Sequence, residues 1–301
     1  MSTLVNVSIV VLSWNTRDLT LACLRALRRD VPRVQREVVV VDNGSQDGSA
    51  DAVAAEFPEV VLVRNAENRL YAEGNNQGVK AATGEDVCLL NSDTEVKPGA
   101  IDTMREFLES SPEHGAVSPR LLNFDGTVQL ACTRIPGLAD PLVDSTIFGR
   151  FWPGTIVHAR TRYHDFDHGH SRDVEQTPGA VFMMRRDEYL DMGGLDERLS
   201  LFFNDVDLCL RLRKKHRRLR YLVDAEVYHH QGASTKRSER VQALWLQNRH
   251  DYYVKHHPWI GGWWLRTVRG LWAMQVGAGI LLGPKNLSQK RAAFGELRRT
   301  L

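Results

Sequence analysis

Residues 85–96 read EDVCLLNSDTEV. The apolar run over residues 87–90 stops at Asn91, Ser92 and Asp93. A short apolar run that ends in polar turn residues is typical of a strand buried on both faces of a parallel sheet. Such a strand would carry Asp93 to the edge of the sheet. Two interpretations stay open here: Asp93 is half of a metal site, or it is a polar residue that ends a strand.

The first hundred residues alternate between strand-like and helix-like segments. Strands are predicted over residues 7–12, 37–41, 60–64 and 86–90, and helices over residues 18–29, 49–57, 75–83 and 98–108. This order predicts an α/β fold with a Rossmann-like, mostly parallel central sheet flanked by helices. The absence of G-x-G-x-x-G after the first strand, and of a P-loop, disfavours a dinucleotide or Walker-type site. Ligands of such sheets bind beyond the carboxyl ends of the strands, where the polar residues collect: Ser13, Asn15, Asp42, Asn43, Asn91 and Asp93.

Three later stretches carry titratable residues. Residues 158–170 read HARTRYHDFDHGH, which suggests a metal site, but the polar loop pattern favours a solvated loop. Asp205 and Asp207 fall at the predicted start of a helix, where one acid suffices as a cap and the second is free for chemistry. On the strand predicted after residue 225, His229 and His230 should face opposite sides of the sheet.

Seven stretches between residues 7 and 235 together resemble a known family. In order they are VSIVVLSWN, VVVVDNGSQDGS, ENRLYAEGNNQG, VCLLNSD, PGAVFMMRR, GGLDERLSLFFNDVDLCLRLR and AEVYHHQGAST. They are similar to glycosyltransferase family 2, and more narrowly to the rhamnosyltransferase-type branch that builds bacterial surface polysaccharides. The resemblance covers about residues 5–250. It implies a GT-A fold and an inverting, metal-dependent glycosyltransferase, a hexosyltransferase-type enzyme.

The resemblance also implies roles for individual residues. Asp205 would be the catalytic base that takes the proton of an acceptor hydroxyl. Asp93 and His229 would bind Mg²⁺ or Mn²⁺ with the diphosphate, and His230 is the second choice if the strand register differs by one. The donor would be a nucleotide-sugar, with dTDP-rhamnose suggested by likeness alone, and the acceptor a glycan or lipid-linked hydroxyl.

The remaining residues implied by the resemblance surround these groups. The nucleotide-sugar site would comprise Ser13, Asn15, Asp42, Asn68, Gly74, Asn75, Asn76, Asn91, Ser92 and Asp93. Supporting or acceptor-binding residues would be Gly179, Asn204, Asp207 and His230.

The sequence departs from the family pattern at two positions. Asn204 stands where glutamate is usual, and Leu70 stands where glycine is expected, which puts the local turn in doubt. The alternative function, a non-catalytic nucleotide-sugar-binding protein of the same fold, draws its only support from Asn204.

Charge and composition divide the chain into regions. Residues 1–240 are predicted to be the catalytic domain, with residues 1–100 as the nucleotide-sugar-binding half and residues 101–240 as the acceptor-binding half. Residues 241–301 are predicted to be a helical extension. Residues 1–200 carry 20 Lys and Arg against 30 Asp and Glu, whereas residues 201–301 carry 19 against 7. This asymmetry suggests an anionic partner for the C-terminal third.

The tryptophans and arginines of residues 258–284 are typical of an interfacial membrane segment, and packing on the catalytic domain or on a homodimer partner is the alternative. No apolar run is long enough to span a bilayer. The four cysteines have no metal or redox spacing and are predicted to be reduced core residues. A cytoplasmic protein, peripheral on the inner face of the membrane, is therefore expected. No nucleic-acid partner is expected.

Overall fold

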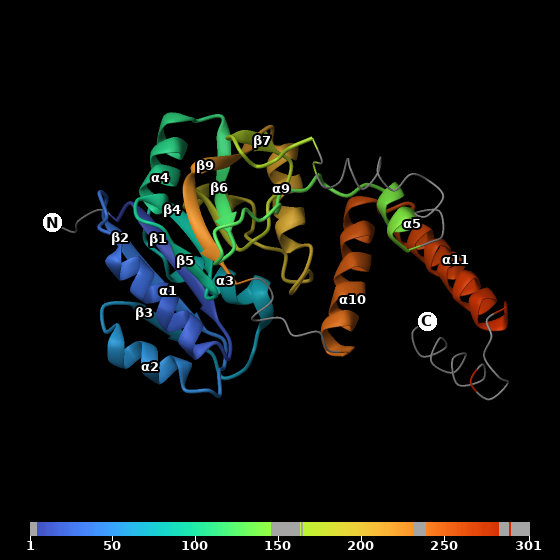
Figure 1. Ribbon diagram of the computed structural model, residues 1–301, viewed down its shortest axis with the longest axis horizontal. Helices are drawn as coiled ribbons and strands as arrows, with labels where there is room; N and C mark the ends of the chain where they lie inside the picture. Colours follow the sequence, from blue (N-terminus) through green and yellow to red (C-terminus); the bar gives the residue numbers. More distant parts are fainter. Residues whose placement is uncertain (1–4, 146–162, 164, 231–238, 283–288, 290–301) are drawn as a thin grey trace. The chain divides into compact units, whose positions relative to one another are not determined.

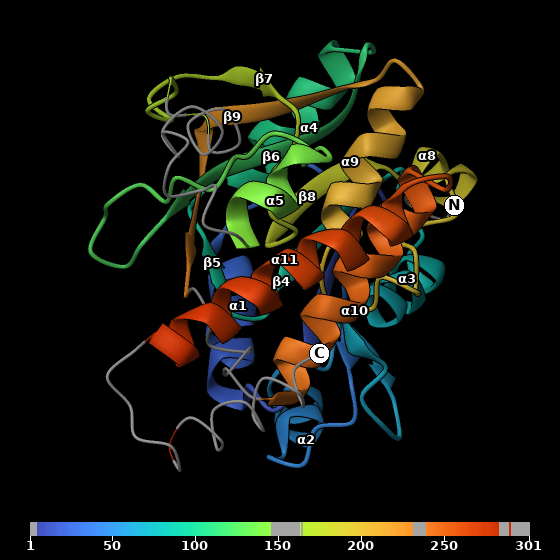
Figure 2. The same ribbon diagram turned by 90° about the vertical axis from the view of Figure 1, so that its right-hand side faces the viewer.

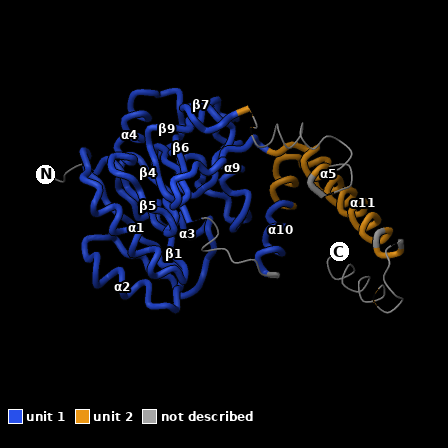
Figure 3. Tube along the Cα trace, in the orientation of Figure 1, with its two compact units in different colours: residues 1–135, 166–249 blue, residues 136–165, 250–301 orange. Residues whose placement is uncertain are grey.

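The computed structural model describes residues 5–145, 163, 165–230, 239–282 and 289. The chain forms two compact units (Figure 3). The first comprises residues 1–135 and 166–249, and the second comprises residues 136–165 and 250–301.

A nine-stranded sheet forms the centre of the first unit within the described residues (Figure 1). Its strand order is β3-β2-β1-β4-β8-β6-β9-β5, and β7 pairs with β9. The strands are β1 Val7–Ser13, β2 Arg36–Asp42, β3 Val61–Arg64, β4 Asp86–Asn91, β5 Thr94–Val96, β6 His114–Leu122, β7 Arg172–Val174, β8 Val181–Arg185 and β9 Arg218–His229. The strands β3, β2, β1 and β4 run parallel, whereas β8 lies antiparallel to both of its neighbours, β4 and β6.

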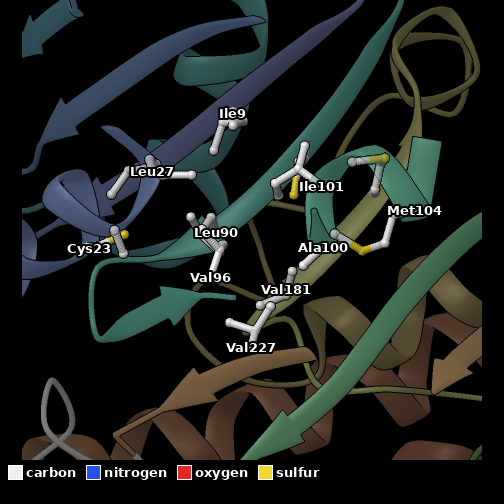
Figure 4. Packing of buried hydrophobic residues seen from close by; sticks show 14 of the residues in the cluster. Ile9, Cys23, Leu27, Leu90, Val96, Ala100, Ile101, Met104, Val181 and Val227 are labelled. Atoms are coloured by element: carbon white, nitrogen blue, oxygen red, sulfur yellow. The ribbon is translucent and has the colours of Figure 1, made fainter. Parts of the chain in front are cut away.

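Helices cover both faces of this sheet (Figures 1 and 2). They are α1 Arg17–Arg29, α2 Ser49–Glu56, α3 Leu70–Ala81, α4 Ala100–Ser110, α8 Arg186–Asp191 and α9 Asn204–Lys214. Alternate strand residues such as Ile9 and Leu90 pack with apolar side chains of α1, α2 and α4 in one large core (Figure 4). On the opposite face α3 packs closely, because a Cβ at Gly78 would meet Val10 at 2.2 Å.

The second unit is helical. Helix α5 (Ala139–Ser145) packs with α11 (Gly261–Leu282), and the indole Nε1 of Trp264 donates to the carbonyl oxygen of Leu138 at 2.6 Å. Helix α10 (Glu239–His256) begins in the first unit and ends in the second. Among the described residues, every helix is either too short or too polar to traverse a bilayer.

The α/β architecture and the C-terminal helices are confirmed, and the four predicted parallel strands lie together as expected. The sheet as a whole is mixed, because antiparallel strands follow β4. Strands β5, β6 and β7 were not predicted, since β5 and β7 have only three residues each and β6 contains glycine and proline. Helix α3 begins at Leu70, five residues before the predicted start at Asn75.

The prediction of a solvated loop over residues 158–170 is confirmed for Asp165, Asp167 and His170, which are exposed, but it is wrong for Phe166 and His168. Phe166 and His168 are buried, and their rings stack with centroids 4.4 Å apart. His168 Nε2 accepts the N–H of Cys132 at 3.1 Å, and burial lowers the pKa of this imidazole. Residues 158–162 and 164 lie outside the described residues. All four cysteines are free and buried, as predicted.

Candidate active site

The register of the sheet brings the polar ends of several strands to one edge. Ser13 lies opposite Asp42, and Leu12 lies opposite Asn91. Because β8 runs antiparallel, its first residues reach the same edge, where the N–H of Asn91 donates to the carbonyl oxygen of Ala180 at 2.9 Å. The edge therefore joins the carboxyl ends of parallel strands to the segment that precedes β8.

A cavity of about 230 Å³ opens at this edge, within the first unit. One group of its lining residues is apolar or aromatic, and the other is polar. The lining comprises Tyr71, Pro178, Gly179, Ala180, Leu201, Phe202 and Phe203, with Asn91, Asp93, Asn204, Asp205 and His229. Six of the residues predicted from the sequence thus share one cavity.

Asp205 lies in the first turn of α9 and lines the cavity. Its Oδ1 accepts the N–H of Val206 at 2.8 Å, and its Oδ2 accepts the N–H of Gly179 and the Nε2–H of Gln176, both at 3.2 Å. Burial raises the pKa of this carboxyl, and the three donors oppose the shift only in part. A fixed carboxylate with a raised pKa is suited to accept a proton.

Gly179 joins Asp205 to Tyr71, a residue that the sequence reasoning missed. The Tyr71 hydroxyl donates to the carbonyl oxygen of Gly179 at 2.5 Å, while the Gly179 N–H binds Asp205. A Cβ at position 179 would lie 2.8 Å from the Tyr71 hydroxyl oxygen. Burial raises the pKa of Tyr71, so the phenol remains a donor.

Asp93 and His229 meet where β5 pairs with β9. Thr94 is the partner of His229 in this ladder, and the His229 Nε2 lies 3.6 Å from the Asp93 Oδ1. Burial lowers the pKa of His229 although Asp93 raises it, which favours the neutral imidazole that binds metals. The ring of His230 faces the other way and stacks on Phe124 with centroids 3.7 Å apart. Of these two histidines, His229 lines the cavity and His230 does not.

Asp93 and His229 together could bind a divalent cation whose remaining ligands come from a bound anion or from water. Among the described residues, no group of three or more His, Cys, Asp or Glu side chains could hold a metal ion. Asp93 and His229 nevertheless both line the cavity, and carboxylate oxygen and imidazole nitrogen are both ligands of Mn²⁺. The other ligands would have to be oxygens of a diphosphate or of water.

Ser13 and Ser92 belong to a buried hydroxyl cluster beneath the edge, and neither lines the cavity. The Ser13 Oγ lies 2.7 Å from the Thr20 Oγ1, and the Ser92 Oγ lies 3.0 Å from the Thr16 Oγ1. Thr16 and Thr20 were not singled out from the sequence. These hydroxyls tie the end of β1 to α1 and to the turn after β4.

We refer to Ser13, Asn15, Asp42, Asn43 and Asn68 as the strand-end cluster, because they gather at the ends of β1 and β2. The Asn15 Oδ1 accepts the N–H of Gln46 at 2.7 Å, and the Asp42 Oδ2 accepts the N–H of Ser45 at 3.1 Å. The Asp42 Oδ1 is buried and receives no hydrogen bond from the described residues. This oxygen therefore has the capacity to accept one further hydrogen bond.

The cluster also holds the turn into α3. The Asn68 Oδ1 accepts the N–H of Leu70 at 2.8 Å and the Nδ2–H of Asn43 at 3.0 Å. Leu70 has a φ of +64°, the left-handed conformation that glycine adopts without strain. The leucine therefore keeps the turn expected of a glycine at this position, at an energetic cost.

Gly74, Asn75 and Asn76 contact the protein and do not line the cavity. A Cβ at Gly74 would meet the Leu12 side chain at 2.5 Å, so glycine at this position allows α3 to pack closely against β1. The Asn76 Oδ1 accepts the Tyr189 hydroxyl at 2.6 Å and the N–H of Leu195 at 2.9 Å, and its Nδ2 donates to the carbonyl oxygen of Leu195. The Asn75 Nδ2 donates to the carbonyl oxygen of Tyr71 at 2.9 Å. A role for these three residues in ligand binding stays a prediction.

Asn204 and Asp207 have structural contacts at the start of α9. The Asn204 Nδ2 donates to the carbonyl oxygen of Leu199 at 3.0 Å, although the residue also lines the cavity. Asp207 is fully buried and pairs with Arg211 at 2.7 Å. Of the two acids in this turn, only Asp205 lines the cavity.

Comparisons with known proteins identify the family and the fold of the chain. A family model described as "Glycosyl transferase family 2" matches residues 8–162. The chain is 29% identical over 248 residues to an N-acetylglucosaminyl-diphospho-decaprenol L-rhamnosyltransferase of Mycobacterium tuberculosis, covering 77% of this chain and 78% of that protein. It is also 29% identical to the O-antigen biosynthesis protein RfbC of Myxococcus xanthus, covering 85% of this chain but only 19% of that protein.

A solved structure shares the fold. A mannosyltransferase of Pyrobaculum calidifontis, PcManGT, was solved in complex with GDP-Man and Mn²⁺. It superposes with a TM-score of 0.56 at 18% sequence identity, covering 98% of this chain and 81% of that chain. At this identity the likeness concerns the fold.

Proposed function

The chain belongs to glycosyl transferase family 2 and has the GT-A fold of a glycosyltransferase, and we propose that it is a metal-dependent, inverting enzyme acting on a nucleotide-sugar. The observation that carries this proposal is the shared cavity of Asp205, Asp93 and His229. A fixed carboxylate with a raised pKa thus lines the same small cavity as two side chains that could together bind one cation.

Asp205 is the base of the proposed reaction. The acceptor hydroxyl oxygen forms a bond to C1 of the donor sugar while the bond from C1 to the diphosphate breaks. The hydroxyl proton goes to the carboxylate of Asp205, and the bond electrons leave with the nucleoside diphosphate. The N–H of Gly179 and the amide of Gln176 hold the carboxylate in place, and Tyr71 in turn holds Gly179.

Asp93 and His229 are the residues that would hold Mg²⁺ or Mn²⁺. The ion, when bound, would offset the negative charge that develops on the leaving diphosphate. Asp42 would accept a hydrogen bond from the nucleoside through its buried Oδ1. The neighbouring Asn15 and Asn68 would keep the loops around that nucleoside in place.

L-Rhamnose from dTDP-rhamnose is the proposed sugar, and a polyprenyl-diphosphate-linked glycan is the proposed acceptor. The support is the 29% identity to the rhamnosyltransferase of M. tuberculosis, which extends over most of both chains. The apolar part of the cavity, with Leu201, Phe202 and Phe203, suits the methyl group of a 6-deoxy sugar.

A donor screen tests the activity. UDP-, GDP-, dTDP- and CMP-sugars are offered with Mn²⁺ or Mg²⁺, and thermal shift and donor hydrolysis are measured. We expect one donor to bind only with metal and to hydrolyse slowly, with hydrolysis lost in Asp205→Asn and binding kept. Binding with no hydrolysis or transfer under any condition would favour the alternative, a non-catalytic nucleotide-sugar-binding protein.

A lipid-linked acceptor calls for contact with a membrane, and α11 offers a surface for it. Trp263, Met274 and Leu281 are exposed along this helix, and Trp259 just before it is 97% exposed. The sequence from residue 252 to 295 contains no Asp or Glu. Apolar side chains flanked by arginines, in a segment without acidic residues, are suited to an anionic lipid surface. The location proposed is therefore peripheral, on the cytoplasmic face of the membrane.

Sedimentation with vesicles tests this surface. We expect the intact protein to bind phosphatidylglycerol vesicles and to lose that binding when Trp259 and Trp263 are both changed to serine. Trp14→Ser, which removes an exposed tryptophan from the other unit, is the matched control. A double variant that still sediments with vesicles would contradict the membrane role of these tryptophans. A double variant that changes from dimer to monomer would favour a homodimer contact instead.

A further inference from the structure

Gln129 lies behind His229, on the segment that follows the turn of residues 123–127. It is 4% exposed and does not line the cavity. Its Nε2 donates to the carbonyl oxygen of His229 and to the Oδ1 of Asn123, both at 2.8 Å. Its Oε1 lies 3.1 Å from the His229 Nδ1. One amide side chain therefore contacts both the main chain and the ring of His229.

These contacts determine which way the Gln129 amide is oriented. The carbonyl oxygen of His229 is an acceptor, so the amide atom beside it must be the nitrogen, which donates. The remaining amide atom, Oε1, can only accept. The His229 Nδ1 must then carry the hydrogen of this contact, and in a neutral ring the Nε2 keeps a lone pair.

That lone pair faces the site. The His229 Nε2 lies 3.6 Å from the Asp93 Oδ1, and both residues line the cavity. Two electron-pair donors side by side are suited to bind one cation. The opposite tautomer would direct the Nε2–H toward the carboxylate and would leave no lone pair on Nε2 for a cation.

We propose that Gln129 is a positioning residue that holds His229 in the Nδ1–H tautomer, so that the Nε2 presents its lone pair beside Asp93. The turn of residues 123–127 supports this role, because the N–H of Asn123 donates to the carbonyl oxygen of Thr127 at 2.8 Å and Asn123 in turn orients Gln129. Phe124 of the same turn stacks on His230. One turn thus fixes both histidines at the end of β9. The inference rests on the proposed function only for the ion that the lone pair meets.

The tautomer can be measured directly in the metal-free protein. Two-bond ¹⁵N–¹H correlations of ¹⁵N-histidine-labelled protein report which ring nitrogen carries the hydrogen, and His229→Ala assigns the signal. We expect the Nδ1–H form in the wild type and in Gln129→Glu, which keeps an acceptor beside Nδ1. We expect a mixture of tautomers in Gln129→Ala. The control, Leu130→Ala, changes the exposed neighbour of Gln129 in sequence and should leave the tautomer unchanged.

Titration with Mn²⁺, alone and with dTDP, gives the second readout. Loss of a hydrogen-bond partner behind a metal-binding histidine typically weakens metal affinity by about 10–100-fold. We expect a loss of that order in Gln129→Ala and a smaller one in Gln129→Glu, with circular dichroism showing folded protein. An Nε2–H tautomer in the wild type, or an unchanged tautomer and unchanged Mn²⁺ affinity in Gln129→Ala, overturns the proposal. If the wild type binds no Mn²⁺ while the tautomer still depends on Gln129, the positioning role is supported and the metal of the proposed function fails.

Discussion

The strand-end cluster and the cavity lie at the same edge of the sheet but use their polar groups differently. In the strand-end cluster, Asn15, Asn43 and Asn68 are bonded to one another or to nearby backbone. In the cavity, the carboxylate of Asp205 and the Asp93–His229 pair border open space. We infer that the cluster and the helix behind it mainly fix loops, whereas the cavity carries the chemistry. Substitutions should therefore separate into effects on stability and effects on turnover.

The largest effect is expected at Asp205. Asp205→Asn removes the proton acceptor, and turnover should fall by about 10²–10⁴-fold. Donor affinity, measured by calorimetry, should stay close to that of the wild type. Asp207→Asn is the matched comparison two residues away, and it should lower stability because it breaks the buried pair with Arg211. A fully stable Asp207→Asn variant with the same loss of turnover would contradict the assignment of the base.

The next effect separates Asp93 from Asn91, which line the cavity two residues apart. Asp93→Ala should weaken metal-dependent nucleotide binding by about 10–100-fold, a loss typical of a disturbed metal site. Asn91→Ala should have little effect, since Asn91 contributes no charge. Calorimetric titration with nucleotide, with and without Mn²⁺, makes the comparison. Nucleotide binding that needs no metal in either variant would contradict the assignment of Asp93 as a metal ligand.

The pH dependence of activity should reflect the environment of Asp205. Burial raises the pKa of its carboxyl, so the group stays protonated and inactive at pH values where an exposed aspartate is already ionised. The acid limb of kcat/KM should therefore lie above the ordinary carboxyl range, with activity falling about tenfold per pH unit below it. The same shift makes the contribution of this group to stability largest at low pH, and that contribution is lost as pH rises through the raised pKa. An acid limb at the ordinary aspartate pKa would contradict the role of burial.

A stability effect without a direct chemical effect is expected at Asn76 of α3. Asn76→Ala leaves the Tyr189 hydroxyl and the N–H of Leu195 without their acceptor, and such losses cost about 1–3 kcal/mol. Urea unfolding measures the change, and the exposed Glu67→Ala is the control. If Asn76→Ala instead weakens nucleotide binding at unchanged stability, then the predicted ligand role is correct and the contrast with the cavity fails.

The smallest effect is expected at Leu70. Its left-handed conformation costs a non-glycine residue about 1–2 kcal/mol, so Leu70→Gly should raise the free energy of unfolding by about 1 kcal/mol. Leu70→Ala keeps the strain and should give no gain. A destabilised Leu70→Gly variant would mean that packing of the leucine side chain outweighs the backbone strain.

The sequence predicted those parts of the fold that depend on local patterns. Apolar runs located the four parallel strands, and the polar residues that end them fell at one edge because parallel strands share a carboxyl end. Strand alternation also separated His229 from His230 correctly, since the two rings face opposite ways.

Contacts between distant segments were beyond the sequence patterns. The sequence around Tyr71 and around Gln129 does not indicate their roles, because each contacts a residue about a hundred positions away. The turn signal Asp125-Gly126 predicts a reversal of the chain, but it does not reveal that Asn123 and Gln129 enclose a histidine. Gly74 and Asn76 were assigned to a ligand by resemblance, while their observed contacts are with β1 and with residues 189–195.

The pairing of β5 with β9 has a consequence for folding order. Strands β1 to β4 follow one another within the first ninety-one residues, whereas β5 pairs with the far end of β9, where His229 lies opposite Thr94. Contacts between residues so distant in sequence form late, because a long loop must close before they contribute. The backbone bond from His230 N–H to the carbonyl oxygen of Asp93, at 2.8 Å, then sets the spacing of the two side chains. Cation binding during refolding should accordingly appear after the parallel half of the sheet has formed, as a late kinetic reporter of the complete sheet.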